Sequence, residues 1–158
     1  MTTHKFELFA DYNQFYVWDA GADPNAPIDY TDEDVRNRVK VAPNVVVIQP
    51  MRNMAVPVEL DVCSSDPGVE LARWDHVAEC SLELPTGKLQ VHECTGGSIL
   101  DLVVAPGTYR LRAHFGNLGL LSEDGLEGDD HYKIVLWRGD APGPLEILKQ
   151  WEGDVNAG

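Results

Sequence analysis

Five carboxylates and one histidine lie within thirteen residues in the stretch LLSEDGLEGDDHY, at positions 120–132. Clustered oxygen ligands with turn-making glycines are typical of calcium loops, although this spacing does not follow the EF-hand pattern. The same carboxylates on a surface loop would suit a basic protein partner, and a hydrated loop without a ligand is the simplest interpretation. The acidic residues are Glu123, Asp124, Glu127, Asp129 and Asp130, and the histidine is His131.

The remaining reactive residues do not assemble into a transition-metal site or a catalytic site. His92 and His114 do not lie at helical or hairpin spacing from His131, so no histidine pair is predicted. The chain contains no Gly-x-Ser-x-Gly, no His-Glu-x-x-His and no glycine-rich phosphate loop. CTGGS at 94–98 has a cysteine but no identifiable base, and indicates a tight turn between strands. The sequence therefore predicts a protein without enzymatic activity, metal or cofactor.

The charge of the chain limits its partners. Asp and Glu number 26 against 12 Lys and Arg, which gives a net charge of −14. A surface this acidic repels nucleic-acid phosphates and anionic membranes, and attracts basic proteins or cations. We therefore expect a basic protein partner, with no direct binding to nucleic acid or membrane.

The compartment is predicted from the start of the chain and its cysteines. MTTHKFELFADY lacks the apolar core of a secretory signal, and no window approaches the roughly 18 consecutive apolar residues of a spanning helix. A cytoplasmic location is expected. The cysteines show no CxxC spacing, which argues against a structural zinc or a disulfide framework. They are Cys63, Cys80 and Cys94.

Most periodic segments alternate with a period of two, as half-buried strands do. In TYRLRAHFG, Tyr109 and alternate apolar residues share one face, while Arg110, Arg112 and His114 share the other. Residues 78–91 resemble a hairpin that turns at Pro85-Thr86-Gly87, and Pro106-Gly107 suggests a second hairpin. Further strands are expected at 5–9, 15–18, 45–49, 56–62, 132–137 and 145–151.

These segments predict an all-β, jelly-roll-like sandwich of about eight to ten strands. It forms one domain over 1–158, with 152–158 as a flexible tail. One short helix is expected in DYTDEDVRNRV, where Thr31 can cap Asp34 and Asp32, Glu33 and Asp34 fill the first turn.

The sequence resembles the competence protein J family. The similarity lies in DYNQFYVWD, APIDYTDEDV and NVVVIQPMRN, and in the later VVAPGTYRLRAHF. The stretch from Cys63 to Trp74, the acidic loop and the last strand have no counterpart in that pattern. The resemblance implies a small protein that inhibits a competence-associated DNA-entry nuclease. The matching positions are Tyr12, Gln14, Phe15, Val17, Pro27, Asp29, Tyr30, Thr31, Asp32, Glu33, Arg52 and Asn53.

Together these observations predict an acidic binding protein that inhibits a nuclease or related toxin by blocking its basic cleft. A calcium-type or small-ligand binding sandwich is the alternative, and a module that pairs through an exposed strand edge stays open as well. The predicted contact residues are Glu123, Asp124, Glu127, Asp129 and Asp130, followed by Asp32, Glu33 and Asp34.

Overall fold

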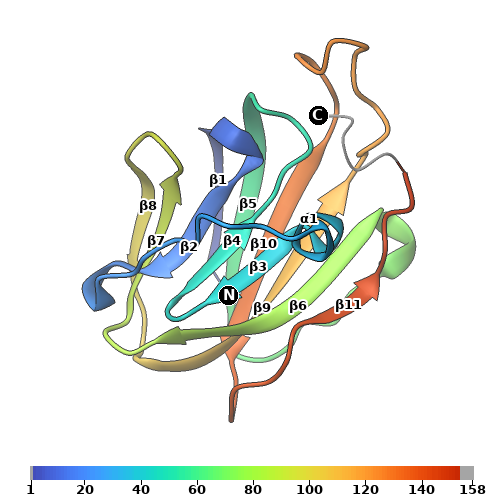
Figure 1. Ribbon diagram of the computed structural model, residues 1–158. Helices are drawn as coiled ribbons and strands as arrows, with labels where there is room; N and C mark the ends of the chain where they lie inside the picture. The colour runs from blue at the N-terminus through green and yellow to red at the C-terminus, as the bar shows by residue number, and fades with distance from the viewer. Residues whose placement is uncertain (1, 154–158) are drawn as a thin grey trace.

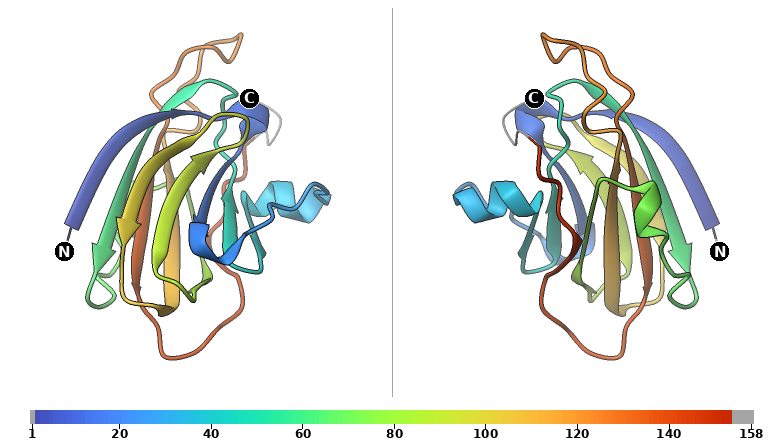
Figure 2. Two further views of the ribbon diagram at one scale, coloured as in Figure 1. Left: turned by 90° about the vertical axis from the view of Figure 1, so that its left-hand side faces the viewer. Right: turned by 90° about the vertical axis from the view of Figure 1, so that its right-hand side faces the viewer.

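Eleven strands in two facing sheets form the framework of the computed structural model, which describes residues 2–153 (Figures 1 and 2). The six-stranded sheet contains, in spatial order, β1 (Thr2–Phe9), β5 (Ala55–Cys63), β10 (His131–Arg138), β9 (Gly107–Gly116), β6 (His76–Leu84) and β11 (Glu146–Lys149). The five-stranded sheet contains β3 (Val39–Ala42), β4 (Val45–Ile48), β2 (Phe15–Asp19), β7 (Lys88–Glu93) and β8 (Ser98–Val103). All strand pairs are antiparallel except β5 with β10.

The predicted all-β sandwich is confirmed. The strand that the sequence did not reveal is β3, whose four residues follow the helix directly and are too short for a clear periodic pattern. The inward faces of the two sheets form one core, to which β9 contributes the expected residues Leu111, Ala113 and Phe115. All four residues of β4 are buried, as is typical of a strand covered on both faces.

Neither predicted hairpin is formed. β6 and β7 flank the turn at 85–87 but belong to different sheets, and so do β8 and β9. Each turn therefore carries the chain across the sandwich. Alternation of apolar residues is the same for a hairpin and for such a crossing, because every strand has one inward face in both cases. The hairpin of this region is β7–β8, which turns at the CTGG stretch predicted as a tight turn.

The short helix α1 (Asp32–Asn37) is confirmed, together with its capping box. Thr31 Oγ1 accepts from the Asp34 amide at 3.1 Å, and Asp34 Oδ2 accepts from the Thr31 amide at 2.9 Å. Lys40 Nζ lies 2.8 Å from the same carboxylate. The bonds from Lys40 and from the Thr31 backbone lower the pKa of Asp34. The charged carboxylate of Asp34 therefore stabilises the start of the helix and binds Lys40 of β3.

The C-terminal segment runs along the helix. Gln150 donates to the Arg36 carbonyl at 3.0 Å, and Glu152 pairs with Arg36 at 3.3 Å. The predicted tail at 152–158 thus begins with an ion-paired residue, and residues 154–158 lie outside the described part of the chain. Within residues 2–153, no helix is long and apolar enough to cross a membrane.

Candidate protein-binding surface

The acidic stretch forms a closed loop between β9 and β10 that projects beyond the end of the sandwich (Figures 1 and 2). Leu121 and Gly128 form an isolated antiparallel bridge. Next to it, the Ser122 amide donates to the Glu127 carbonyl at 2.8 Å, and the Asp129 amide donates to the Leu120 carbonyl at 2.9 Å. These backbone bonds make the loop a small structured arm.

Asp124 holds the tip of this arm in shape. Its Oδ1 accepts from the Ser122 hydroxyl at 2.6 Å and from the Leu126 amide at 3.0 Å, while the Ser122 hydroxyl accepts from the Glu127 amide at 3.0 Å. Gly125, between them, has a φ of 71°, which a residue with a side chain rarely adopts. The bond from Ser122 lowers the pKa of Asp124. The carboxylates of the tip are therefore displayed on a preorganised backbone.

A buried polar network fixes the base of the loop. Arg52 Nε lies 2.6 Å from Asp130 Oδ1, and the Tyr132 hydroxyl donates to Asp130 Oδ2 at 2.5 Å. The Arg52 guanidinium also donates to the Leu126 carbonyl at 3.1 Å, so one side chain holds both the base and the tip. The Met51 amide donates to the Tyr132 oxygen at 2.8 Å. Burial and the neighbouring Asp130 raise the pKa of Tyr132, so its hydroxyl keeps the proton that it donates to Asp130.

The prediction that Asp130 contacts a partner is wrong. Only 1% of this residue is exposed, and its charge is neutralised by Arg52. A buried carboxylate needs a charged and hydrogen-bonded partner, and the internal network supplies both. Asp130 is therefore part of the framework that holds the loop.

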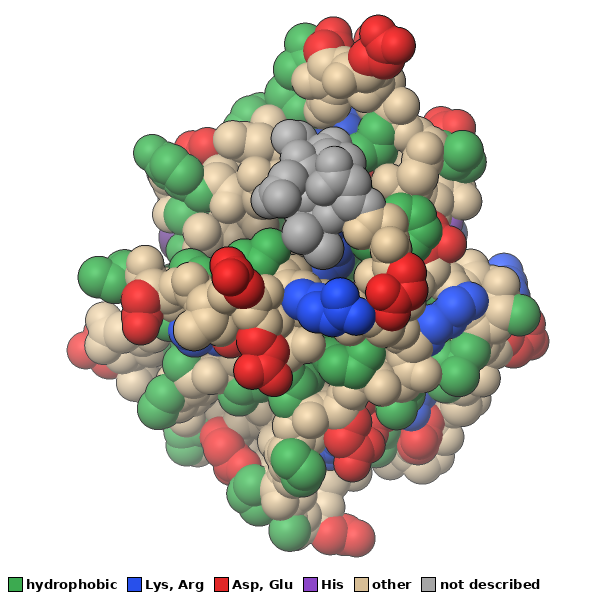
Figure 3. Space-filling view, turned by 45° about the vertical axis from the view of Figure 1, so that its right-hand side comes forward, with side chains coloured by type: hydrophobic (Ala, Val, Ile, Leu, Met, Phe, Trp, Pro, Cys, Tyr) green, Lys and Arg blue, Asp and Glu red, His purple; other side chains and the backbone are tan. Residues whose placement is uncertain are grey.

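The other four carboxylates of the loop are exposed, and the same loop exposes two leucines. Leu120 is 56% exposed and Leu126 is 52% exposed. Figure 3 shows acidic and hydrophobic side chains together on the projecting end of the molecule. Apolar anchors within a charged rim are typical of protein–protein contacts. The exposed carboxylates belong to Glu123, Asp124, Glu127 and Asp129.

The second predicted group is on a different part of the surface. Asp32 and Glu33 are exposed on α1, whereas Asp34 is partly covered and bound to Lys40. The helix and the loop project at different heights of the sandwich (Figure 2). The structure therefore divides the predicted contact residues between two surfaces, with Asp34 mainly structural.

A third acidic region, on the outer face of the six-stranded sheet, is largely neutralised by arginines. Arg112 lies 2.8 Å from Glu79 and 3.0 Å from Asp66, and its guanidinium carbon lies 4.6 Å from the ring centre of Trp137. Arg110 pairs with the second oxygen of Glu79 at 3.1 Å. The stretch 63–74, which contains Asp66, thereby folds over the sheet.

The same stretch brings together two histidines that sequence reasoning left apart. The indole of Trp74 lies 5.0 Å from the His114 ring and 5.2 Å from the His131 ring, between ring centres. They line a cavity of about 530 Å³. Within residues 2–153, no group of three or more His, Cys, Asp or Glu side chains is placed to hold a metal ion. The cation-binding alternative stays a prediction from the sequence.

Comparison with solved structures identifies this arrangement of sheets. ComJ from Bacillus subtilis, described as an inhibitor of the DNA-degrading activity of NucA, superposes with a TM-score of 0.68 at 19% sequence identity. The match covers 86% of this chain and 96% of ComJ. The protein has the fold of ComJ. The similarity inferred from the sequence is thus confirmed at the level of the fold.

A second solved structure has the same fold. It is described as crocagin biosynthetic gene J and matches with a TM-score of 0.59 at 22% identity, over 87% of this chain and 99% of that one. No family model matches the sequence, and no curated protein is significantly similar to it. The ComJ fold therefore occurs in proteins whose sequences share little identity.

Proposed function

We propose that the protein inhibits a nuclease, or a related toxin, by inserting its acidic loop into the basic cleft of the enzyme. The observation that carries this proposal is the fold shared with ComJ, itself described as an inhibitor of the DNA-degrading activity of NucA. The net charge of −14 gives a second line of support.

The loop has the properties that such a contact requires. A nuclease cleft must attract DNA phosphates, so it is lined with Lys and Arg. Glu123, Glu127 and Asp129 are exposed carboxylates on a backbone closed by its own hydrogen bonds, so little ordering is needed on binding. Leu120 and Leu126 add apolar area beside these charges. Charge matching raises the association rate and sets specificity, while the leucines contribute to affinity.

This mechanism requires no chemistry from the protein itself. The inhibitor acts by occupying the site, and a repulsive charge keeps it off the nucleic acid that the enzyme binds. We place the interaction in the cytoplasm, with a basic protein as the partner.

The experiment that tests the function is a DNA-degradation assay with purified NucA and with any basic nuclease that the protein captures. We expect inhibition at an equimolar ratio in about 0.1 M salt and weaker inhibition in about 1 M salt. The Debye length, over which charges act on each other, shortens from about 10 Å to about 3 Å between these conditions. Binding of the protein to lysozyme, which is basic but does not cleave DNA, is measured separately as the control for non-specific charge pairing. Undiminished DNA cleavage by every enzyme tested at low salt would reject the proposal.

A further inference from the structure

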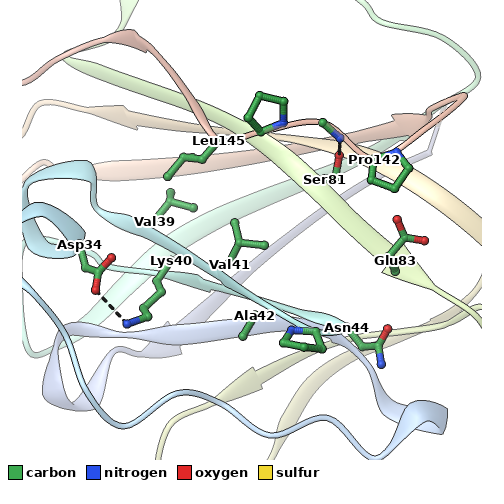
Figure 4. Close-up of a pocket in the computed structure, with 13 residues that line it drawn as sticks. Asp34, Val39, Lys40, Val41, Ala42, Asn44, Ser81, Glu83, Pro142 and Leu145 are labelled. Carbon is green, nitrogen blue, oxygen red and sulfur yellow. Dashed lines mark hydrogen bonds and ion pairs between the residues drawn. The ribbon is translucent and has the colours of Figure 1, made fainter.

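A groove runs along the side of the sandwich, where the edges of the two sheets face each other (Figure 4). One wall is β3, the edge strand of the five-stranded sheet. The other wall consists of β6 and the segment 142–145, and the volume between them is about 600 Å³. Val39, Val41 and Leu145 are directed into this space (Figure 4).

The backbone of β3 has hydrogen-bonding groups that point out of its sheet. The Gln49 amide donates to the Arg38 carbonyl at 2.9 Å, which marks these two residues as a hydrogen-bonded pair of the β3–β4 ladder. Because such pairs alternate, Val39 and Val41 direct their N–H and C=O groups away from β4. Val39 is fully buried, whereas Val41 is 42% exposed, so the backbone of Val41 is the accessible part of this edge. This edge can therefore accept another strand.

In the described part of the chain, no strand of the opposite wall pairs with the outer edge of β3. β11 pairs with β6 only at Val77–Glu79, so within residues 2–153 the Cys80–Leu84 part of β6 has no strand on this side. The segment 142–145 is attached by side-chain bonds: the Gly143 amide donates to Ser81 Oγ at 2.8 Å. Two of its four residues are prolines, which have no N–H to offer.

The charges around the groove favour a basic occupant. Glu83 lies on the β6 wall, where Thr108 donates to one of its carboxylate oxygens at 2.8 Å and the other is buried without a hydrogen-bond partner. The cation that lines the groove, Lys40, is bound to Asp34. The exposed carboxylates of Asp32 and Glu33 belong to the same helical turn as Asp34.

We propose that this groove binds an extended, lysine- or arginine-containing segment of the nuclease, which adds as a strand to β3. This inference rests on the proposed function and gives the inhibitor a second contact besides the acidic loop. Backbone bonds to the accessible Val41 supply the strand pairing, Val41 and Leu145 receive the apolar side chains, and Glu83 and the α1 carboxylates select the basic ones.

The edge can be blocked by Val41→Pro and Val41→Lys. The proline removes the outward N–H and leaves the β3–β4 bonds in place, and the lysine blunts the edge with charge. Matched controls are Val103→Pro and Val103→Lys on β8, the other edge of the same sheet. There the Val104 amide donates to the Gly87 carbonyl at 2.8 Å, so the Val103 N–H also points outward. Val103 is 89% exposed.

The probe is the acetylated and amidated peptide Lys-Val-Lys-Val-Lys, titrated into ¹⁵N-labelled protein, with Glu-Val-Glu-Val-Glu for comparison. We expect saturable amide shifts centred on residues 39–42 with the lysine peptide. Either Val41 variant should weaken its binding about tenfold, as the loss of one or two backbone hydrogen bonds implies. The Val103 variants should bind it as the wild-type protein does.

Equal peptide binding by the wild-type protein and both Val41 variants would overturn the inference, and so would amide shifts centred on β8. Dimerisation through β3 would also overturn it, because the occupant of the groove would then be a second copy of the protein. Inhibition assays separate this outcome from the proposed function. Full nuclease inhibition by both Val41 variants rejects the groove and leaves the loop contact standing. Peptide binding without inhibition of any nuclease rejects the proposed function and, with it, the nuclease as occupant.

Discussion

Replacing Arg52 with methionine is expected to lower the free energy of unfolding by about 3–5 kcal/mol, because it leaves the buried Asp130 carboxylate without its counter-ion. The Nε–Oδ1 distance is 2.6 Å, and both side chains are almost fully buried. The same variant removes the bond to the Leu126 carbonyl and so frees the loop tip. For a chain of this size, such a loss lowers the melting temperature by about 10 °C. Urea unfolding and thermal melting give the two values.

The matched control is Arg36→Met, which breaks the exposed pair with Glu152. Its side chains are 54% and 70% exposed, so we expect a loss of less than about 1 kcal/mol. The double variant Arg52→Met/Asp130→Leu removes both buried charges and should be more stable than Arg52→Met alone. If Arg52→Met and Arg36→Met have the same stability, the buried network does not hold the loop base.

The stability of the fold should fall steeply between about pH 6.5 and pH 4. Burial, with Arg38 and Arg36 nearby, lowers the pKa of His76 to about 4, although the bond to Asn37 opposes the shift. Burial also lowers the pKa of His114 to about 4. The His76 Nε2–H donates to the Asn37 carbonyl at 2.7 Å, and Nδ1 accepts from the Trp151 amide at 3.0 Å. Protonation at Nδ1 would turn that acceptor into a donor facing another donor.

The unfolded chain takes up these protons first as the pH falls, because its histidines have a pKa near 6.5. The stabilisation by the neutral rings is therefore complete above that pH. It is lost at up to about 1.4 kcal/mol per pH unit for each histidine, about 3 kcal/mol each in total. Urea unfolding at several pH values should show this slope, and His76→Gln and His114→Asn should each reduce it by about half. An unchanged slope in both variants would contradict the assignment.

The alternation of apolar residues revealed most of the strands but not which strands pair. TYRLRAHFG correctly placed Leu111 and Phe115 in the core. The turns at 85–87 and 106–107 were wrongly assigned to hairpins, because local pattern records the buried face of a strand and not the sheet to which it belongs. The helix was predicted together with its cap, since Thr31 and Asp34 are three residues apart and interact locally.

The binding surface was predicted only in part, for a related reason. Composition indicates how many carboxylates exist, but burial and long-range partners decide which are displayed. Asp129 and Asp130 are adjacent in the sequence, yet one is exposed and the other is paired with Arg52, 78 residues away. The sequence offers one signal of this pairing, which is the presence of Arg52 in the family-like stretch NVVVIQPMRN. It does not show that Asp130 is the partner of Arg52. The contact of Trp74 with His114 and His131 was hidden in the same way.

The association rate constant with an inhibited nuclease tests the role of the loop most directly. The loop variant is Glu123→Gln/Glu127→Gln/Asp129→Asn, which keeps Asp124 and therefore the internal bonds of the loop. The control, Glu7→Gln/Glu70→Gln/Asp140→Asn, removes three exposed carboxylates from the body of the sandwich and changes the net charge equally. At low salt the loop variant should associate at least about tenfold more slowly than the control. Equal rates for the two variants would show that the loop is not the contact.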